Sequence, residues 1–473
     1  MDELGLILLL IAERALAVTV IAHAVLNKRD VGSAIGWSGL AWLTPLVGSL
    51  LYGLLGINRI ERRAVRLRRG GGRSGARGDT SAGLVEAHGY AQLAPIARLA
   101  DRVTDLPLTE GNRIVPLVDG DAAYPAMVEA IERAERNVVL ASYIFDDDRA
   151  GRRFVEALET AHRRGVDVRV LIDGAGEHYS RIPISRTLRR LGIRVEKFLH
   201  SPLPWRNRYL NLRNHRKLLV VDGKVGFTGG MNIRENCLLA LEPDKPVQDL
   251  HFRLEGPVVM HLVQAFAIDW EFTTGEALDR EAWFPPLDPV GESLARGVPE
   301  GPDEDFETIR QVLLAALAQA TDRVRICTSY FVPDQTLIAA LNTTALRGVD
   351  VEVVIPARPN LPVIRWASMA QMGLVLPAGI RVIETPPPFD HSKLMLVDDA
   401  WAFFGSSNWD VRSLRLNFEF NVECYDRDLV DALHRLLDAK VHAGRRLTLA
   451  EVERRPLPVR LRDGLTRLLS PYL

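Results

Sequence analysis

An internal repeat is the feature that most constrains how these 473 residues can fold. The β-rich run Asn137–Phe145 returns as Arg323–Phe331, and each run precedes a helical pattern that ends in Arg-Gly-Val-Asp-Val, at Arg164–Val168 and Arg347–Val351. A glycine directly after the last helical turn ends a helix, and the Val/Ile-rich runs that follow are typical of strands buried on both faces. Strand–helix–strand therefore occurs twice, which predicts an α/β protein of two halves with mixed sheets flanked by helices.

Each half then carries one histidine, one lysine, one aspartate and one asparagine at identical spacing. The two sets are His215, Lys217, Asp222 and Asn232 in the first half and His391, Lys393, Asp398 and Asn408 in the second. A short motif needs structural context before it supports a function, and two copies at the same point of a repeat supply that context. Two ordinary strand histidines are the competing interpretation, which leaves the matched spacing unexplained.

The histidine and lysine of each set are two residues apart on a predicted strand, so both side chains point to the same face. If the two halves pack around a pseudo-twofold axis, both pairs meet in one cleft. Lysine ammonium and asparagine amide groups donate hydrogen bonds without carrying negative charge, so they suit the oxygens of a phosphate. We therefore expect a phosphodiester site that needs no metal ion and no cofactor.

Two histidines can divide the acid–base work at such a site. One, neutral, attacks phosphorus and becomes a phosphohistidine, while the other, protonated, donates to the leaving alkoxide and then deprotonates a second alcohol. A carboxylate on the far nitrogen of each ring would fix its tautomer, and Asp249 and Glu419, which follow the two motifs, are the candidates. The predicted catalytic residues are the two matched sets His215, Lys217, Asp222 and His391, Lys393, Asp398. Within them, Asp222 and Asp398 could hold the rings in place of Asp249 and Glu419, or they could brace lysines and backbone turns.

The N-terminal end is apolar and then abruptly basic. Val31–Ile57 contains no charged residue, and Leu4–Leu26 carries only Glu13 and Arg14 near its middle. Both segments are long enough to cross a hydrocarbon core of about 30 Å, so we expect two spanning helices. One spanning helix with a re-entrant or interfacial segment is the alternative.

A basic segment follows these helices and predicts their orientation. Its arginines are Arg59, Arg62, Arg63, Arg66, Arg68 and Arg69. Positive charge beside a membrane helix is typical of the cytoplasmic side, so the remainder of the chain is expected in the cytoplasm. The arginines could also contact anionic headgroups.

The doubled His-x-Lys-x4-Asp motif resembles the signature of the phospholipase D superfamily, over about Leu117 to the C-terminus. The chain also resembles bacterial cardiolipin synthases, which carry two N-terminal apolar helices and a basic stretch ahead of two such halves. The blocks that carry this second resemblance are Trp42–Gly48, Leu51–Gly53, Asn408–Leu414, Leu416–Asn421 and Arg467–Leu473.

This resemblance implies two phospholipase-D-like halves behind a transmembrane helical hairpin in the bacterial inner membrane. It also implies transfer of a phosphatidyl group from one phosphatidylglycerol to another, with release of glycerol, so that phosphatidylglycerol, other anionic phospholipids and the membrane are the partners. In the superfamily the N-terminal motif usually supplies the nucleophile, which favours His215 as nucleophile and His391 as general acid and base. The longer segment before His215, Ser201–Arg213, could cover a covalent intermediate.

The expected boundaries are residues 1–57 for the membrane helices, 58–110 for a basic linker and pre-domain segment, 111–300 for the first half and 301–473 for the second. A phospholipid hydrolase or headgroup-exchange enzyme is the alternative, because the same motifs serve those reactions. A nuclease is less favoured, and no nucleic-acid partner is expected, because the formal net charge is −1 and aromatic residues that could stack bases lie among basic ones only at Pro204–Tyr209. The acceptor alcohol and the oligomeric state stay open at this point.

Overall fold

The computed structural model describes residues 3–28, 31–56, 80–180, 182–199, 212–301 and 307–470. These residues form a small N-terminal unit, within residues 3–56, and a large unit that begins at Thr80. The basic segment that follows Ile57 and most of the segment before His215 lie outside the described residues.

The N-terminal unit contains one helix that could cross a membrane. This helix, α1 (Glu3–Asn27), is apolar over Ile7–Asn27. The second apolar segment is divided into α2 (Val31–Leu43), α3 (Pro45–Leu51) and a π-helical turn. With 13 residues α2 reaches only about 20 Å, which is less than a hydrocarbon core.

The second segment folds back on itself beside α1. Arg14 near the middle of α1 donates to the Trp42 carbonyl at 3.0 Å, and its guanidinium lies 5.0 Å from the Trp42 ring centroid. Beyond the break at Thr44 the chain returns toward the end of α1, where Lys28 donates to the Gly56 carbonyl at 2.5 Å. The expectation of two full spans is thus not supported, because Pro45 has no N–H to continue the α2 helix and the chain reverses there.

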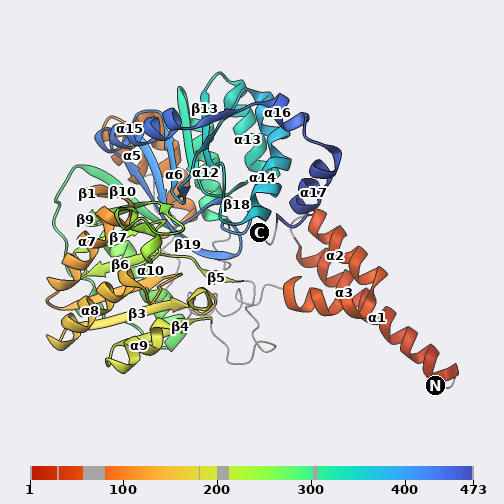
Figure 1. The fold of residues 1–473 in the computed structure, drawn as a ribbon, viewed down its shortest axis with the longest axis horizontal. Coiled ribbons are helices and arrows are strands. Elements are labelled where there is room, and N and C mark those ends of the chain that lie inside the picture. Colours follow the sequence, from red (N-terminus) through yellow and green to blue (C-terminus); the bar gives the residue numbers. More distant parts are fainter. Residues whose placement is uncertain are drawn as a thin grey trace. The chain divides into compact units, whose positions relative to one another are not determined.

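The large unit is built on one mixed sheet to which both halves contribute equivalent strands (Figure 1). From its outer edge inward, the first half contributes β4 (Arg194–Phe198), β3 (Asp167–Asp173), β2 (Asn137–Ser142), β6 (Leu218–Val221), β7 (Val225–Gly229), β9 (Leu250–Glu255) and β1 (Thr109–Val118). The second half contributes, in the same order, β14 (Arg381–Thr385), β13 (Asp350–Pro356), β11 (Arg323–Thr328), β16 (Lys393–Val397), β17 (Trp401–Gly405), β19 (Asn417–Tyr425) and β10 (Ser293–Glu300). One further strand, β20 (Arg445–Leu447), pairs antiparallel with β14 at the outer edge of this half.

The halves join where β1 and β10 pair antiparallel at the centre of the sheet. In each half three parallel strands, β2–β3–β4 and β11–β13–β14, are followed inward by antiparallel ones. This arrangement confirms the repeated strand–helix–strand pattern. Because β10 occupies the place that β1 has in the first half, the sheet assigns β10 to the second half, slightly before the boundary expected at residue 301.

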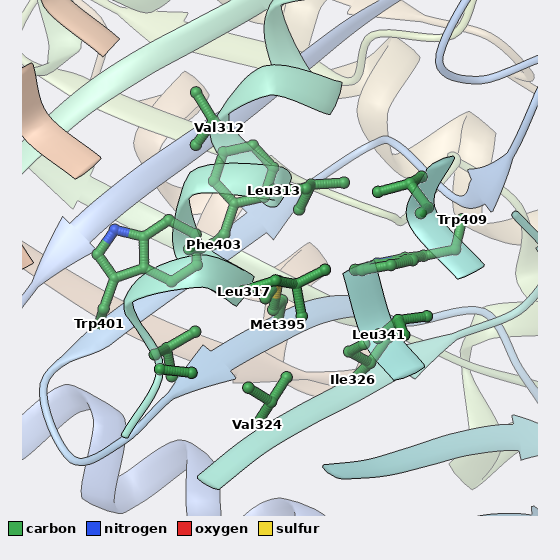
Figure 2. Close-up of a cluster of buried hydrophobic side chains, with 14 of the residues drawn as sticks. Val312, Leu313, Leu317, Val324, Ile326, Leu341, Met395, Trp401, Phe403 and Trp409 are labelled. Atoms are coloured by element: carbon green, nitrogen blue, oxygen red, sulfur yellow. The ribbon is translucent and has the colours of Figure 1, made fainter. Parts of the chain in front are cut away.

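Helices cover the sheet and bury a separate apolar core in each half. The first core lies under α7 (Asp119–Glu132) and α8 (Arg149–Arg163). The second lies under α12 (Thr308–Gln319) and α13 (Gln335–Leu346), and Figure 2 shows Leu313 and Leu317 of α12 against Met395, Trp401 and Phe403 of the sheet. These cores fix the strands whose ends carry the polar motifs.

Residues 80–103 are part of the second core. Their helices α5 (Thr80–Ala87) and α6 (Ala94–Val103) bury Val85, Ile96 and other side chains against α12, and both lie among second-half elements in Figure 1. The sequence had placed these residues in a pre-domain segment, because their apolar positions do not show which later helix they contact.

Candidate active site

Two short strand pairs cross between the halves and bring the two motifs together. In the first, β5 (Arg213–Asn214), just before His215, pairs parallel with the start of β19. In the second, β15 (Phe389–Asp390), just before His391, pairs parallel with β8 (Val247–Gln248). The backbone N–H groups of the two histidines donate across these junctions, to the Phe418 carbonyl at 2.9 Å and the Gln248 carbonyl at 2.7 Å.

Each histidine is held by a carboxylate from the other half. His215 Nδ1 lies 3.1 Å from Glu419 Oε2, and His391 Nδ1 lies 2.8 Å from Asp249 Oδ2. The two imidazole rings face each other, with centroids 6.5 Å apart and planes at 79°. The structure therefore places both predicted carboxylates on the histidines, with partners exchanged between the halves.

This pairing determines which ring nitrogen is available for chemistry. With Nδ1–H donated to a carboxylate, Nε2 keeps its lone pair. Burial lowers the pKa of His391 to about 4, assisted by the positive charge of Lys393 and opposed by Asp249. Burial also lowers the pKa of His215, and Glu419 opposes the shift. Both rings are thus neutral at pH 7 before an anion arrives.

The two motif lysines are buried beside the histidines. Lys217 Nζ donates to the His215 carbonyl at 2.6 Å, and Lys393 Nζ donates to the His391 carbonyl and to Ser329 Oγ. Burial lowers the pKa of Lys217 to about 7 and also lowers that of Lys393, although the nearby carboxylates oppose both shifts. An anionic phosphate between the rings would raise both lysine pKa values again, because a nearby negative charge stabilises the ammonium form.

The motif asparagines use their carbonyl oxygens to contact the protein. Asn232 Oδ1 accepts from the Ile144 N–H at 3.1 Å, and Asn408 Oδ1 accepts from Ser329 Oγ at 2.7 Å. This leaves the amide NH₂ as the donor end of both side chains. Ser329 joins Asn408 to Lys393, so one hydroxyl fixes two of the predicted phosphate donors.

The structure does not bring Asp222 and Asp398 to the histidines. Asp222 follows β6 at the end opposite Lys217, five residues and about 17 Å away along the strand direction. Its carboxylate accepts from the N–H groups of Arg136 and Asn137 at 2.7 and 3.0 Å, and Asp398 makes the matching contacts to Asp322 and Arg323 at 2.8 and 3.0 Å. Both aspartates therefore brace backbone turns, which the sequence analysis gave as their alternative role. Neither lies beside the histidines, as their prediction as catalytic residues had required.

Two ion pairs support the histidine-bearing segments, and sequence analysis missed both. Arg216 pairs with Asp269 at 2.6 Å and donates to the Glu419 carbonyl at 3.0 Å, so it ties the His215 segment to the strand that carries Glu419. Asp390, beside His391, pairs with Lys440 at 2.5 Å. The position of Arg216 inside the first motif was the available signal, but its partner lies 53 residues away in the sequence.

The carboxylates sit in different surroundings. Ser406 Oγ donates to Glu419 Oε2 at 2.5 Å, and Asn417 Nδ2 donates to Glu419 Oε1 at 3.1 Å. The repeat places Gly230 where Ser406 stands, and a Cβ there would collide with the Asp249 carboxylate. Glu419 is thus held by side chains, whereas Asp249 fills the space that glycine leaves free.

The described residues contain no group of three or more His, Cys, Asp or Glu side chains arranged to hold a metal ion. The arrangement at the centre of the sheet instead offers two neutral imidazoles, two buried ammonium groups and two amide donors. These groups can hold an anion, attack it and move a proton on its far side.

The mixed sheet and its paired motifs define a phospholipase-D-like protein. A family model described as "Cardiolipin synthase, PLD-like domain" matches residues 127–266 and 313–440, and the chain belongs to this family. It is 30% identical over 460 residues to Cardiolipin synthase 1 of Staphylococcus epidermidis, covering 94% of this chain and 93% of that one. It is 32% identical over 466 residues to Cardiolipin synthase A of Pseudomonas fluorescens, covering 95% of each chain.

A solved structure with low sequence identity shares the fold. The phosphatidylserine synthase of Haemophilus influenzae is 16% identical, covers 80% of this chain and 100% of its own, and superposes with a TM-score of 0.61. At that identity the likeness concerns the arrangement of the two halves alone.

Proposed function

We propose that this protein is a cardiolipin synthase, which transfers a phosphatidyl group from one phosphatidylglycerol to another and releases glycerol. Relatives with that name match it over more than nine-tenths of both chains. The observation that carries the proposal is the crossed pair of contacts, His215 with Glu419 and His391 with Asp249, which sets two imidazoles face to face.

In the first step His215 Nε2 attacks the phosphorus of the donor lipid. A P–N bond forms, the P–O bond to glycerol breaks, and protonated His391 gives its proton to the departing alkoxide. The Glu419 carboxylate, which holds Nδ1 of the ring, stabilises the positive charge that His215 gains. His391 takes up its proton when the anionic phosphodiester binds beside it, because a nearby negative charge raises a histidine pKa.

In the second step the terminal hydroxyl of another phosphatidylglycerol gives its proton to His391 Nε2. Its oxygen attacks phosphorus, the P–N bond breaks, and His215 is again neutral. Lys217, Lys393, Asn232 and Asn408 stabilise the negative charge on the equatorial oxygens in both steps. Transfer requires that the alcohol, and not water, reaches the intermediate.

We also propose a membrane arrangement. Helix α1 is long enough to span the bilayer, and the second apolar segment enters and leaves on the side of Lys28, because it turns back at Thr44. The chain after Gly56 then continues on that side, where the arginine-rich segment favours the cytoplasm.

The test is an assay of purified full-length protein in detergent micelles with EDTA present. Phosphatidylglycerol carries a radioactive phosphate and a separate label in its glycerol headgroup. Cardiolipin and free glycerol in equal amounts are the expected products. Phosphatidic acid as the main lipid product would identify a hydrolase, and release of glycerol without cardiolipin in the presence of another alcohol would identify a headgroup-exchange enzyme.

A further inference from the structure

The repeat itself cannot distinguish the two alcohols of the reaction, because equivalent residues flank both sides of a pseudo-twofold site. A distinction has to come from residues at which the halves differ. Arg213 lies two residues before His215, where the second half has Phe389, and Arg412 lies four residues after Asn408, where the first half has Asn236. Two arginines thus occur next to the active site without counterparts in the other half.

The backbone brings these two arginines together from positions 199 residues apart in the sequence. Arg213 on β5 pairs in register with Asn417 of β19. The Asn417 N–H donates to the Arg412 carbonyl at 3.1 Å. Both arginines are half-buried, and burial together with the positive charge of Arg213 lowers the pKa of Arg412.

Aromatic rings lie beside both histidines. The Tyr143 ring lies 5.1 Å from the His215 ring and 6.2 Å from Tyr179, which is 65% exposed. On the other side Phe389 lies 5.8 Å from His391 and stacks on Tyr330 at 6.4 Å.

The two arginines interact electrostatically with the tyrosines of this group. The positive charge of Arg213 opposes the rise that burial causes in the Tyr143 pKa. Tyr143 and Tyr179 in turn oppose the fall in the Arg412 pKa. The Asp410 carboxylate interacts with the Arg412 charge and also accepts from the Ser413 N–H and hydroxyl at 2.7 and 3.2 Å.

We propose that Arg213 and Arg412 bind the phosphate of the acceptor phosphatidylglycerol. This inference rests on the proposed function and names the substrate group that it leaves unassigned. The acceptor hydroxyl and the acceptor phosphate are joined by a single glycerol unit, so a second phosphodiester lies next to the reacting one during transfer. Lys217 and Lys393 compensate the reacting phosphate, and a planar guanidinium can bind the second one through two parallel N–H groups.

The experiment compares two acceptors in the same reaction. Full-length protein receives labelled phosphatidylglycerol in micelles that contain ethanol, an acceptor without a phosphate, and cardiolipin and phosphatidylethanol are counted. In R213Q and in R412Q we expect the ratio of cardiolipin to phosphatidylethanol to fall about tenfold or more, because each loses a charge-assisted contact. R412K, which keeps the charge, should recover part of the ratio.

R153Q, a change of an exposed arginine on α8, is the matched control and should leave the ratio unaltered. An unchanged ratio in both glutamine variants, or an equal loss of both products in properly folded protein, would overturn the acceptor-phosphate site. A wild-type enzyme that forms phosphatidylethanol but no cardiolipin would instead overturn the proposed function. In that case glycerol 3-phosphate and ethanol are offered together as acceptors to the wild-type protein and to R412Q. A smaller share of the glycerol 3-phosphate product in R412Q would show that the arginines select a phosphate-bearing alcohol, and an equal share would show that they do not.

Discussion

Asp249 and His391 come from opposite halves of the repeat, and their side chains meet at 2.8 Å. Glu419 and His215 repeat the relationship in the opposite direction at 3.1 Å. Neither half therefore contains a complete histidine–carboxylate pair. Both the orientation of the rings and the reactivity of their Nε2 atoms depend on the junction between the halves.

Replacing either motif histidine with alanine should remove most turnover. His215→Ala and His391→Ala each lose a group that no other side chain replaces, and a positioned acid or base contributes about 10²- to 10⁴-fold. The measurement is the rate of cardiolipin formation from phosphatidylglycerol. His442→Ala, at an exposed position on α15 (Arg427–Ala443), is the control. A near-normal rate in either motif variant would exclude the two-histidine mechanism.

The covalent intermediate should form on His215. Reaction with phosphorus-labelled lipid, quenched at alkaline pH and followed by proteolysis, is expected to leave label on the peptide that contains His215. The His391→Ala variant should retain label longer, because it lacks the base for the second step. Label on the His391 peptide of the wild-type protein would reverse the two roles.

Glu419→Gln should act on His215, although the two residues belong to different halves. The amide keeps the shape of the side chain and removes the charge that raises the His215 pKa, so the pKa falls further and the acid limb of the kcat profile moves to lower pH. Loss of tautomer control should lower kcat by on the order of 10²- to 10⁴-fold. Asp249→Asn is the mirrored variant and should alter the limb that belongs to His391. A shift of the same limb by both variants would contradict the crossed assignment.

Loss of the Lys217 proton should lower kcat/KM at alkaline pH. Its lowered pKa of about 7 means that the ammonium is charged below that pH and neutral above it, so binding of an anionic lipid weakens as pH rises through 7. We therefore expect kcat/KM of the wild-type protein to fall above about pH 7. In Lys217→Arg the side chain stays charged, so this fall in kcat/KM should disappear. Lys224→Met, an exposed lysine, is the control. An identical alkaline limb in Lys217→Arg would show that another group titrates.

Asp222→Ala should reduce stability more than chemistry. The substitution leaves the N–H groups of Glu135, Arg136 and Asn137 without their shared acceptor, at a cost of about 1–3 kcal/mol in the free energy of unfolding. Thermal unfolding in detergent measures the loss, and Asp244→Ala, at an exposed site, is the control. The folded fraction should keep a kcat within a few-fold of wild type. A large loss of kcat with unchanged thermal stability would return Asp222 to the catalytic group.

The second apolar segment shows why an apolar composition predicts too little. Val31–Ile57 is free of charge and long enough to span, which led to the expectation of two full spans. The direction of the chain, however, depends on Pro45 and on the contacts of Arg14 with Trp42 and of Lys28 with Gly56. Such contacts join residues 28 positions apart, and no local pattern contains them.

The sequence by itself determined the repeat, the α/β class and the two His-Lys pairs, and it named candidate carboxylates for the histidines, because spacing along a strand and the identity of polar residues are local properties. Only the tertiary structure decided which carboxylate holds which histidine, that Asp222 and Asp398 brace turns, and that Arg216 and Lys440 form ion pairs at the site. The physical reason is that the site depends on two long-range strand pairings. Strand β5 pairs with β19, whose paired residues are 204 positions apart in the sequence, and β15 pairs with β8, whose paired residues are 142 positions apart. Such pairings depend on how both cores pack against one sheet, which no single segment encodes.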